Sequence, residues 1–144
     1  FDQWQNFENT GQWRFTPPTH VLAALRQALI EHDADGGVEG RGYRYLENCE
    51  TLIQGMKTLG FKPYLRNELQ APIIVTFHQP RIKNFNFAEF YSRLLERGFM
   101  IYPGKITKVD SFRIGCIGQI QKFDMKNLVE AVAGVVAEMG VKLK

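Results

Sequence analysis

Two short segments in the second half of the chain, Phe99 to Tyr102 and Ser111 to Ile117, most constrain its fold. Both are rich in aromatic and β-branched residues, and a polar loop separates them, which predicts two neighbouring strands. Because side chains alternate along an extended chain, Phe112 and Ile114 share one face of the second strand and Arg113 takes the other. The fold must therefore cover one face of this strand and leave an arginine on the opposite face.

Arg113 is the first candidate functional residue. Gly115 and Gly118 leave open space near its guanidinium. An arginine held on a rigid strand among small residues suits bidentate recognition of a carboxylate or a phosphate. A solvated arginine on an exposed sheet face is an equally simple interpretation, and the residues alone leave both open.

Hydrophobic periodicity predicts four helices, which run from Thr16 to about His32, Val38 to Leu59, Asn86 to Gly98 and Asp124 to about Met139. Thr16, Asn86 and Asp124 are the predicted N-caps, and Glu89 completes a capping box with Asn86. Pro17 and Pro18 suit the first turn of the first helix. Residues 1 to 11 lack a clean period and predict no regular element.

Two further strands are predicted, from Lys62 to Leu65 and from Pro72 to Phe77. The second is a nearly continuous apolar run, which is typical of a strand covered on both faces. The resulting order is helix, helix, strand, strand, helix, strand, strand, helix. It predicts an α/β fold with an α+β-like small domain, in which helices cover one side of a mixed or mostly antiparallel four-stranded sheet.

Composition disfavours several classes of partner and compartment. The net charge of +3 is spread along the chain, whereas a nucleic-acid-binding protein usually presents one basic face. No apolar run approaches the roughly 18 to 20 residues of a membrane span, and no signal-peptide pattern is found. Cys49 and Cys116 lie far apart and do not suggest a disulfide framework, which favours a reducing compartment such as the cytoplasm.

Catalytic motifs are scarce in the sequence. The three histidines have no metal-ligand spacing, and there is no nucleophile elbow, P-loop or dinucleotide fingerprint. Lys105 follows Pro-Gly in a polar loop, which lacks the desolvated pocket that a Schiff-base lysine needs. Thr16 precedes a predicted helix N-terminus, where a hydroxyl either binds a phosphate or serves as an ordinary cap.

Several motifs along the whole chain form one recognisable pattern. Their residues are Gln12 to His20, Gly36 to Glu39, Arg41, Arg44, Tyr45, Asn48, Gly55, Met56, Leu59 to Phe61, Pro72 to Ile74, Phe99, Ile101 to Lys105, Phe112 to Gly115, Ile117 and Gly118. This pattern resembles that of 2-aminoethylphosphonate–pyruvate aminotransferases, which belong to the class V branch of the fold-type I pyridoxal-phosphate enzymes. One departure is Cys116, where the family pattern has an asparagine.

The resemblance implies a transaminase that uses pyridoxal 5'-phosphate, forms a homodimer and moves the amino group of 2-aminoethylphosphonate to pyruvate, giving phosphonoacetaldehyde and alanine. Arg113 matches the arginine that holds the acidic group of the substrate. Thr16 matches the threonine that reaches across the dimer interface to the cofactor phosphate. Neither nucleic acid nor membrane is an expected partner.

The resemblance also implies that this chain is the C-terminal portion of such an enzyme. Residues 1–35 correspond to the tail of the large domain and a connecting helix, and residues 36–144 correspond to the small domain. The Schiff-base lysine and most of the phosphate site then precede Phe1, so we expect no catalytic residue in this chain and no turnover by it alone. The alternatives are another class V aminotransferase, of the alanine–glyoxylate or phosphoserine type, or a stand-alone binding module.

Overall fold

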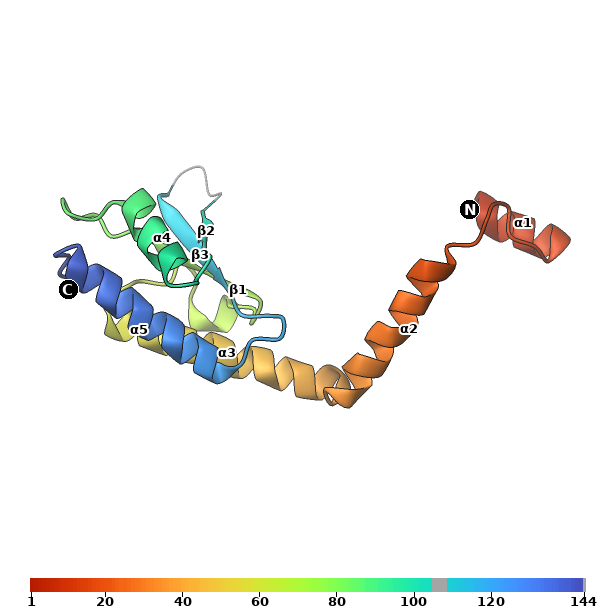
Figure 1. Cartoon of the computed structure of the whole chain (residues 1–144), viewed down its shortest axis with the longest axis horizontal. Coiled ribbons are helices and arrows are strands. Elements are labelled where there is room, and N and C mark those ends of the chain that lie inside the picture. Colours follow the sequence, from red (N-terminus) through yellow and green to blue (C-terminus); the bar gives the residue numbers. More distant parts are fainter. Residues whose placement is uncertain (105–108, 144) are drawn as a thin grey trace. The chain divides into compact units, whose positions relative to one another are not determined.

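The computed structural model describes residues 1–104 and 109–143 of the chain (Figure 1). The chain divides into two units, Phe1–Arg41 and Gly42–Lys144. The first unit holds helices α1 (Asp2–Thr10) and α2 (Thr19–Ala34) and the start of α3 (Gly37–Thr58). The division of the chain at residues 35 and 36 into parts of two domains stays a prediction.

Helix α1 forms where the sequence pattern predicts no element. Its C-cap is Gly11, whose φ of 66° lies in the left-handed region that glycine adopts without strain. The Gly11 N–H donates to Phe7 O at 2.8 Å. The Asn6 Nδ2 donates to Gln12 O at 2.7 Å and so closes the chain over the end of the helix. Local capping, rather than a buried face, accounts for this helix, since none of its residues is buried.

Helix α2 begins later than predicted, and Thr16 is not its N-cap. The N-cap is Pro18, and no side chain caps this helix end. The Leu22 N–H donates to Pro18 O at 3.0 Å, so the Pro18 carbonyl accepts the first backbone hydrogen bond of the helix. A residue that precedes a proline is disfavoured in helical conformation, and this applies to both Thr16 and Pro17. The chain therefore turns into the helix only after both prolines.

The described part of the second unit contains a three-stranded antiparallel sheet in the order β1-β3-β2, built from β1 (Ile74–His78), β2 (Tyr102–Pro103) and β3 (Ser111–Gly115). The predicted fourth strand, Lys62 to Leu65, is reduced to a single bridge between Pro63 and Phe77. The Tyr64 N–H donates to Thr76 O at 2.8 Å on one side of that bridge. Pro63 has no N–H to donate, so the pairing does not extend into a full strand.

The two faces of the sheet differ in burial. Val75 and Phe77 of β1 are fully buried and pair with Ile114 and Phe112 of β3. This confirms the predicted core face of β3. The expectation that β1 is covered on both faces is wrong, because burial alternates along the strand and Ile74, Thr76 and His78 are only half-buried. One face of the sheet is thus the core face, and the other, which carries Arg113, is only partly covered.

Three helices, α3, α4 (Phe87–Glu96) and α5 (Lys122–Glu138), supply the core face with its partners, and a short 3-10 helix lies at Asn67–Leu69. Asn86 is the predicted N-cap of α4, and its side chain accepts from the Glu89 N–H at 3.0 Å. Asp124 does not cap α5. It lies three residues inside the helix, where its carboxylate accepts from the N–H of the true cap, Gln121, at 2.7 Å.

The largest fully buried side chains include Leu52, Met56, Phe61, Phe77, Phe90, Leu94, Phe112 and Val132.

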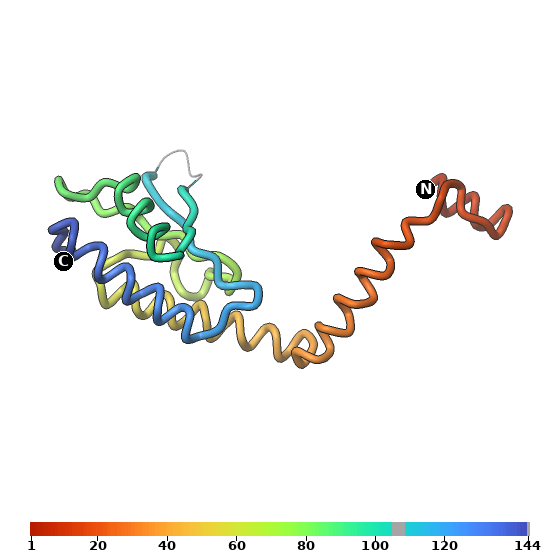
Figure 2. The backbone as a smooth tube through the Cα atoms, viewed as in Figure 1, coloured from red at the N-terminus to blue at the C-terminus, as the bar shows by residue number. Residues whose placement is uncertain are grey.

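Helices α3 and α5 lie side by side (Figure 2). A Cβ built on Gly55 of α3 would lie 2.6 Å from Cγ2 of Val129 on α5, so a glycine is required at this contact. We expect Gly55→Ala to lower the free energy of unfolding by up to about 2 kcal/mol, because overpacking of a tight contact costs about 1–3 kcal/mol and the gain in helix propensity offsets about 1 kcal/mol of it. Gly134→Ala is the matched control, since a Cβ at Gly134 meets nothing within 4 Å.

The control should behave in the opposite sense. Alanine exceeds glycine in helix propensity by about 1 kcal/mol, so Gly134→Ala should raise the free energy of unfolding by up to that amount. Urea denaturation of both variants measures the two effects. Equal stabilisation by the two substitutions would show that α3 and α5 do not approach each other closely at Gly55.

Candidate anion site

The central strand β3 places Arg113 in the middle of the open face of the sheet. The register pairs Arg113 with Thr76 of β1 on one side and with Tyr102 of β2 on the other. Residues directly opposite one another in antiparallel strands point to the same face. Three polar side chains therefore form one row across the sheet, on the face away from the core.

The guanidinium of Arg113 is held at one of its three nitrogens. Its Nε donates to Pro103 O at 3.3 Å, which directs the side chain toward β2. Within residues 1–104 and 109–143, no carboxylate pairs with this guanidinium, so its two terminal nitrogens are available to an anion. A Cβ built on Gly115, two residues along the strand, would meet no atom within 4 Å, and the same holds at Gly118. The open space that the sequence indicated is present at both glycines.

The loop after β3 is fastened to helix α3. Asn48 is fully buried, and its Nδ2 donates to Cys116 O at 3.1 Å and to Ile120 O at 3.0 Å. The Arg44 Nη2 donates to Gly118 O at 3.3 Å. Asn48 is one of the residues that match the family pattern, and the sequence alone assigns it no role. Its two hydrogen bonds join positions about seventy residues apart, and no local pattern reveals such a contact.

Two buried thiols meet beside this loop. Cys49 and Cys116 are both free cysteines and both buried. The hydrogen bond to Cys49 and burial raise the pKa of the Cys116 thiol, so Cys116 stays protonated. The hydrogen bond from Cys116 lowers the pKa of Cys49. Cys116 is thus a neutral thiol in the core.

Thr16 and Arg113 lie in different units of the chain. Thr16 is exposed, and its hydroxyl is not used as a helix cap. Lys105, which the sequence disfavours as a Schiff-base lysine, falls outside the described residues. Across the part of the chain that the structure describes, no group of three or more potential ligands is placed to hold a metal ion. In the same residues, no helix combines the length and hydrophobicity needed to cross a membrane.

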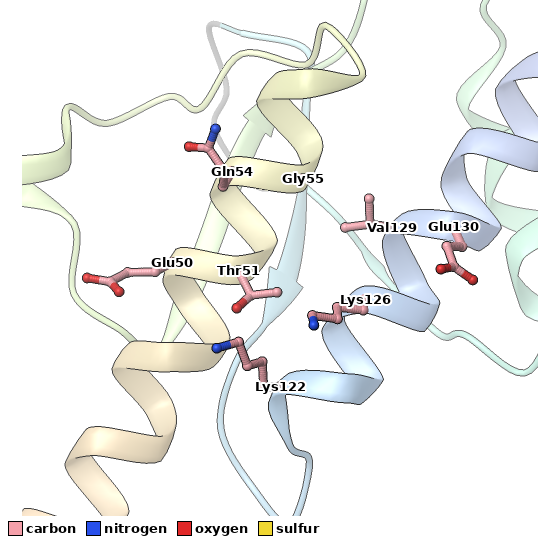
Figure 3. A pocket seen from close by; sticks show the side chains of 8 residues that line it. All are labelled: Glu50, Thr51, Gln54, Gly55, Lys122, Lys126, Val129 and Glu130. Carbon is pink, nitrogen blue, oxygen red and sulfur yellow. The ribbon is translucent and has the colours of Figure 1, made fainter.

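A groove of about 500 Å³ runs between α3 and α5 (Figure 3). Its charged lining residues are two acidic and two basic side chains, Glu50, Glu130, Lys122 and Lys126, and Arg113 is not among them. Lys122 is already paired with Glu47 at 2.8 Å. The charges of this groove balance, so it does not favour an anion as the Arg113 row does.

Solved structures with a similar fold define the class. The chain superposes with a TM-score of 0.81 and 18% identity on pyridoxamine–pyruvate aminotransferase from Mesorhizobium loti, covering 99% of this chain and 37% of that one. It superposes with a TM-score of 0.78 and 21% identity on an alanine–glyoxylate aminotransferase from Nostoc, covering 94% of this chain and 36% of that one. The fold is that of the fold-type I aminotransferases.

Sequence relatives narrow this class. The chain is 50% identical over 144 residues to 2-aminoethylphosphonate–pyruvate transaminase from Cupriavidus necator. The matched region covers 100% of this chain and 38% of the relative. It is 51% identical over 140 residues to the transaminase of the same name from Pseudomonas aeruginosa. That matched region covers 97% of this chain and 38% of the relative. No family model matches the chain.

These findings confirm the resemblance drawn from the sequence motifs. The chain is a homologue of the 2-aminoethylphosphonate–pyruvate transaminases and corresponds to their C-terminal portion. It spans about two fifths of the length of the curated relatives it matches.

Proposed function

We propose that this chain is the C-terminal part of a pyridoxal-phosphate-dependent transaminase that moves the amino group of 2-aminoethylphosphonate to pyruvate and yields phosphonoacetaldehyde and alanine. The observation that carries the proposal is the 50% identity, over the whole chain, to transaminases of that name. Both substrates bear an anionic group. In 2-aminoethylphosphonate the phosphonate lies one carbon away from the carbon that carries the amino group, and in pyruvate the carboxylate is attached directly to the keto carbon. The open-faced Arg113 supplies the cationic fork that such groups require.

Arg113 is the proposed substrate-binding residue. Its Nε bond to Pro103 O holds the side chain in place and uses neither of the two terminal nitrogens. Binding therefore orients the substrate by its acidic group and leaves the amino or keto end free to react. An arginine held in this way loses little conformational freedom on binding, which favours affinity.

Pyridoxal 5'-phosphate is the proposed cofactor of the full-length protein. One solved structure with a similar fold, SPT at a TM-score of 0.52, holds this cofactor. When bound, it supplies the electron sink that transamination needs. On this chain Thr16 is the residue that would hold the cofactor phosphate. Its exposed hydroxyl is not engaged as a helix cap, and no side chain caps the N–H groups that begin α2, which fits a phosphate ligand.

A homodimer is part of the proposal. The first unit exposes large aromatic side chains, with Phe1 91% and Phe15 71% exposed, and α2 exposes an apolar stripe that includes Leu25 and Leu29. Exposed apolar surface of this kind marks an interaction site rather than the surface of a self-contained module. In the proposed dimer Thr16 reaches the cofactor of the partner's site. The free state of both cysteines is compatible with the cytoplasm as the proposed location.

The experiment uses the full-length protein that carries this chain, purified and supplied with pyridoxal 5'-phosphate. We expect alanine to form from 2-aminoethylphosphonate and pyruvate, measured with alanine dehydrogenase. Phosphoserine with 2-oxoglutarate, and alanine with glyoxylate, test the other class V activities. Turnover of either pair in place of 2-aminoethylphosphonate and pyruvate would contradict the proposed substrate.

A further inference from the structure

The row that contains Arg113 carries a hydroxyl on each side. Thr76 and Tyr102 are the two residues that the register places directly opposite Arg113. Cβ atoms in such pairs lie about 4.5–5.5 Å apart, within reach of a ligand that one side chain already binds. Tyr102 is 50% exposed, so its phenol is not part of the core.

The number of oxygens on the ligand decides what this row can recognise. The fork of a guanidinium donates two parallel N–H groups, which satisfy the two oxygens of a carboxylate. A phosphonate presents three oxygens and a larger charge, so one oxygen remains without a donor on the arginine. Threonine and tyrosine hydroxyls are donors of the required kind.

The two sides of the row are not equivalent. The bond from Arg113 Nε to Pro103 O directs the guanidinium toward β2 and therefore toward Tyr102. Thr76 lies on β1, on the side of the arginine from which the guanidinium is turned away. A tetrahedral group seated on the guanidinium would thus have the Tyr102 hydroxyl beside it, whereas a planar carboxylate would be satisfied by the arginine alone.

We infer that Tyr102 donates a hydrogen bond to the phosphonate oxygen that Arg113 leaves unsatisfied, and that it sets the preference of this site for a phosphonate over a carboxylate. The inference rests on the proposed function, because the phosphonate substrate is part of that proposal. Tyr102 acts as a specificity-determining residue and takes no part in proton transfer.

The test compares the two substrates of one enzyme. Tyr102→Phe is made in the full-length protein, and KM is measured separately for 2-aminoethylphosphonate and for pyruvate. Loss of a hydrogen bond to a charged group should raise the KM for the phosphonate about tenfold or more. The KM for pyruvate should change by less than about threefold, since the arginine fork satisfies both of its carboxylate oxygens.

Tyr64→Phe is the matched control. Tyr64 is also a partly exposed tyrosine of the second unit, but its ring packs on His78 at 5.3 Å between centroids and it does not pair with Arg113. Both KM values should be unchanged in this variant. An unchanged ratio of the two KM values in Tyr102→Phe, whether neither value moves or both rise equally, overturns the inference. A wild-type protein that does not use 2-aminoethylphosphonate would instead refute the proposed function.

Discussion

Replacement of Arg113 by alanine is expected to raise the KM for both 2-aminoethylphosphonate and pyruvate by about 10- to 150-fold in the full-length protein. That range corresponds to the roughly 1.5–3 kcal/mol that a hydrogen bond to a charged group contributes. Both substrates should be affected, because each is held by its acidic group on the same guanidinium. The side chain lies on the open face of the sheet and the core face is untouched, so the fold should persist.

Two further variants make this result specific. Arg113→Lys keeps the charge but loses the planar fork, so we expect a smaller rise in KM than with alanine. Arg97→Ala is the control, since Arg97 is a surface arginine bound to Glu138 at 2.6 Å and is the C-cap residue that follows α4. It should leave both KM values unchanged. Unchanged KM values in Arg113→Ala, with circular dichroism showing a folded protein, would show that Arg113 is a solvated surface residue that does not bind the substrates.

Local patterns predicted the helices well where capping and hydrophobic periodicity agree. The helix expected from Val38 to Leu59 is observed as Gly37–Thr58. Its end follows from Gly60, whose φ of 95° few residues other than glycine adopt. The Asn86 cap follows from the same kind of local chemistry. Such interactions depend on residues three or four positions apart, which a sequence displays directly.

The errors occurred where a local signal had two solutions. Asp124 has the chemistry of a cap, but Gln121 three residues earlier forms the capping box with it and extends the helix by a turn. Thr16 has the same chemistry, yet the two prolines after it postpone the helix to Thr19. In the first case a second side chain competes for the cap position, and in the second the prolines restrict the backbone of the residues before them.

The site could be predicted only in part. Alternation along β3 was enough to place Arg113 opposite Phe112 and Ile114, and the structure confirms that placement. Thr76 was hidden inside an apolar run that suggested a strand buried on both faces. Its position beside Arg113 depends on the register between β1 and β3, which are more than thirty residues apart in the sequence. Register is fixed by packing of the whole face, so no short motif contains it.

The position of Arg113 also depends on a contact that lies outside its own strand. Asn48 on α3 binds the carbonyls of Cys116 and Ile120, which bracket the loop that follows β3. We expect Asn48→Leu to lower the free energy of unfolding by about 2–4 kcal/mol. Leucine has a similar size but no donor, so the two carbonyls lose their partner, and an unsatisfied buried acceptor costs about 1–3 kcal/mol.

Asn127→Leu provides the matched control, because Asn127 lies exposed on α5 and the same change there removes no buried hydrogen bond. Surface substitutions of this kind usually stay within about 0.5 kcal/mol. Urea denaturation of the two variants therefore separates the effect of the buried amide from that of the added apolar surface. A loss below 0.5 kcal/mol in Asn48→Leu would mean that water replaces the amide at both carbonyls, and that α3 does not fasten the loop beside Arg113.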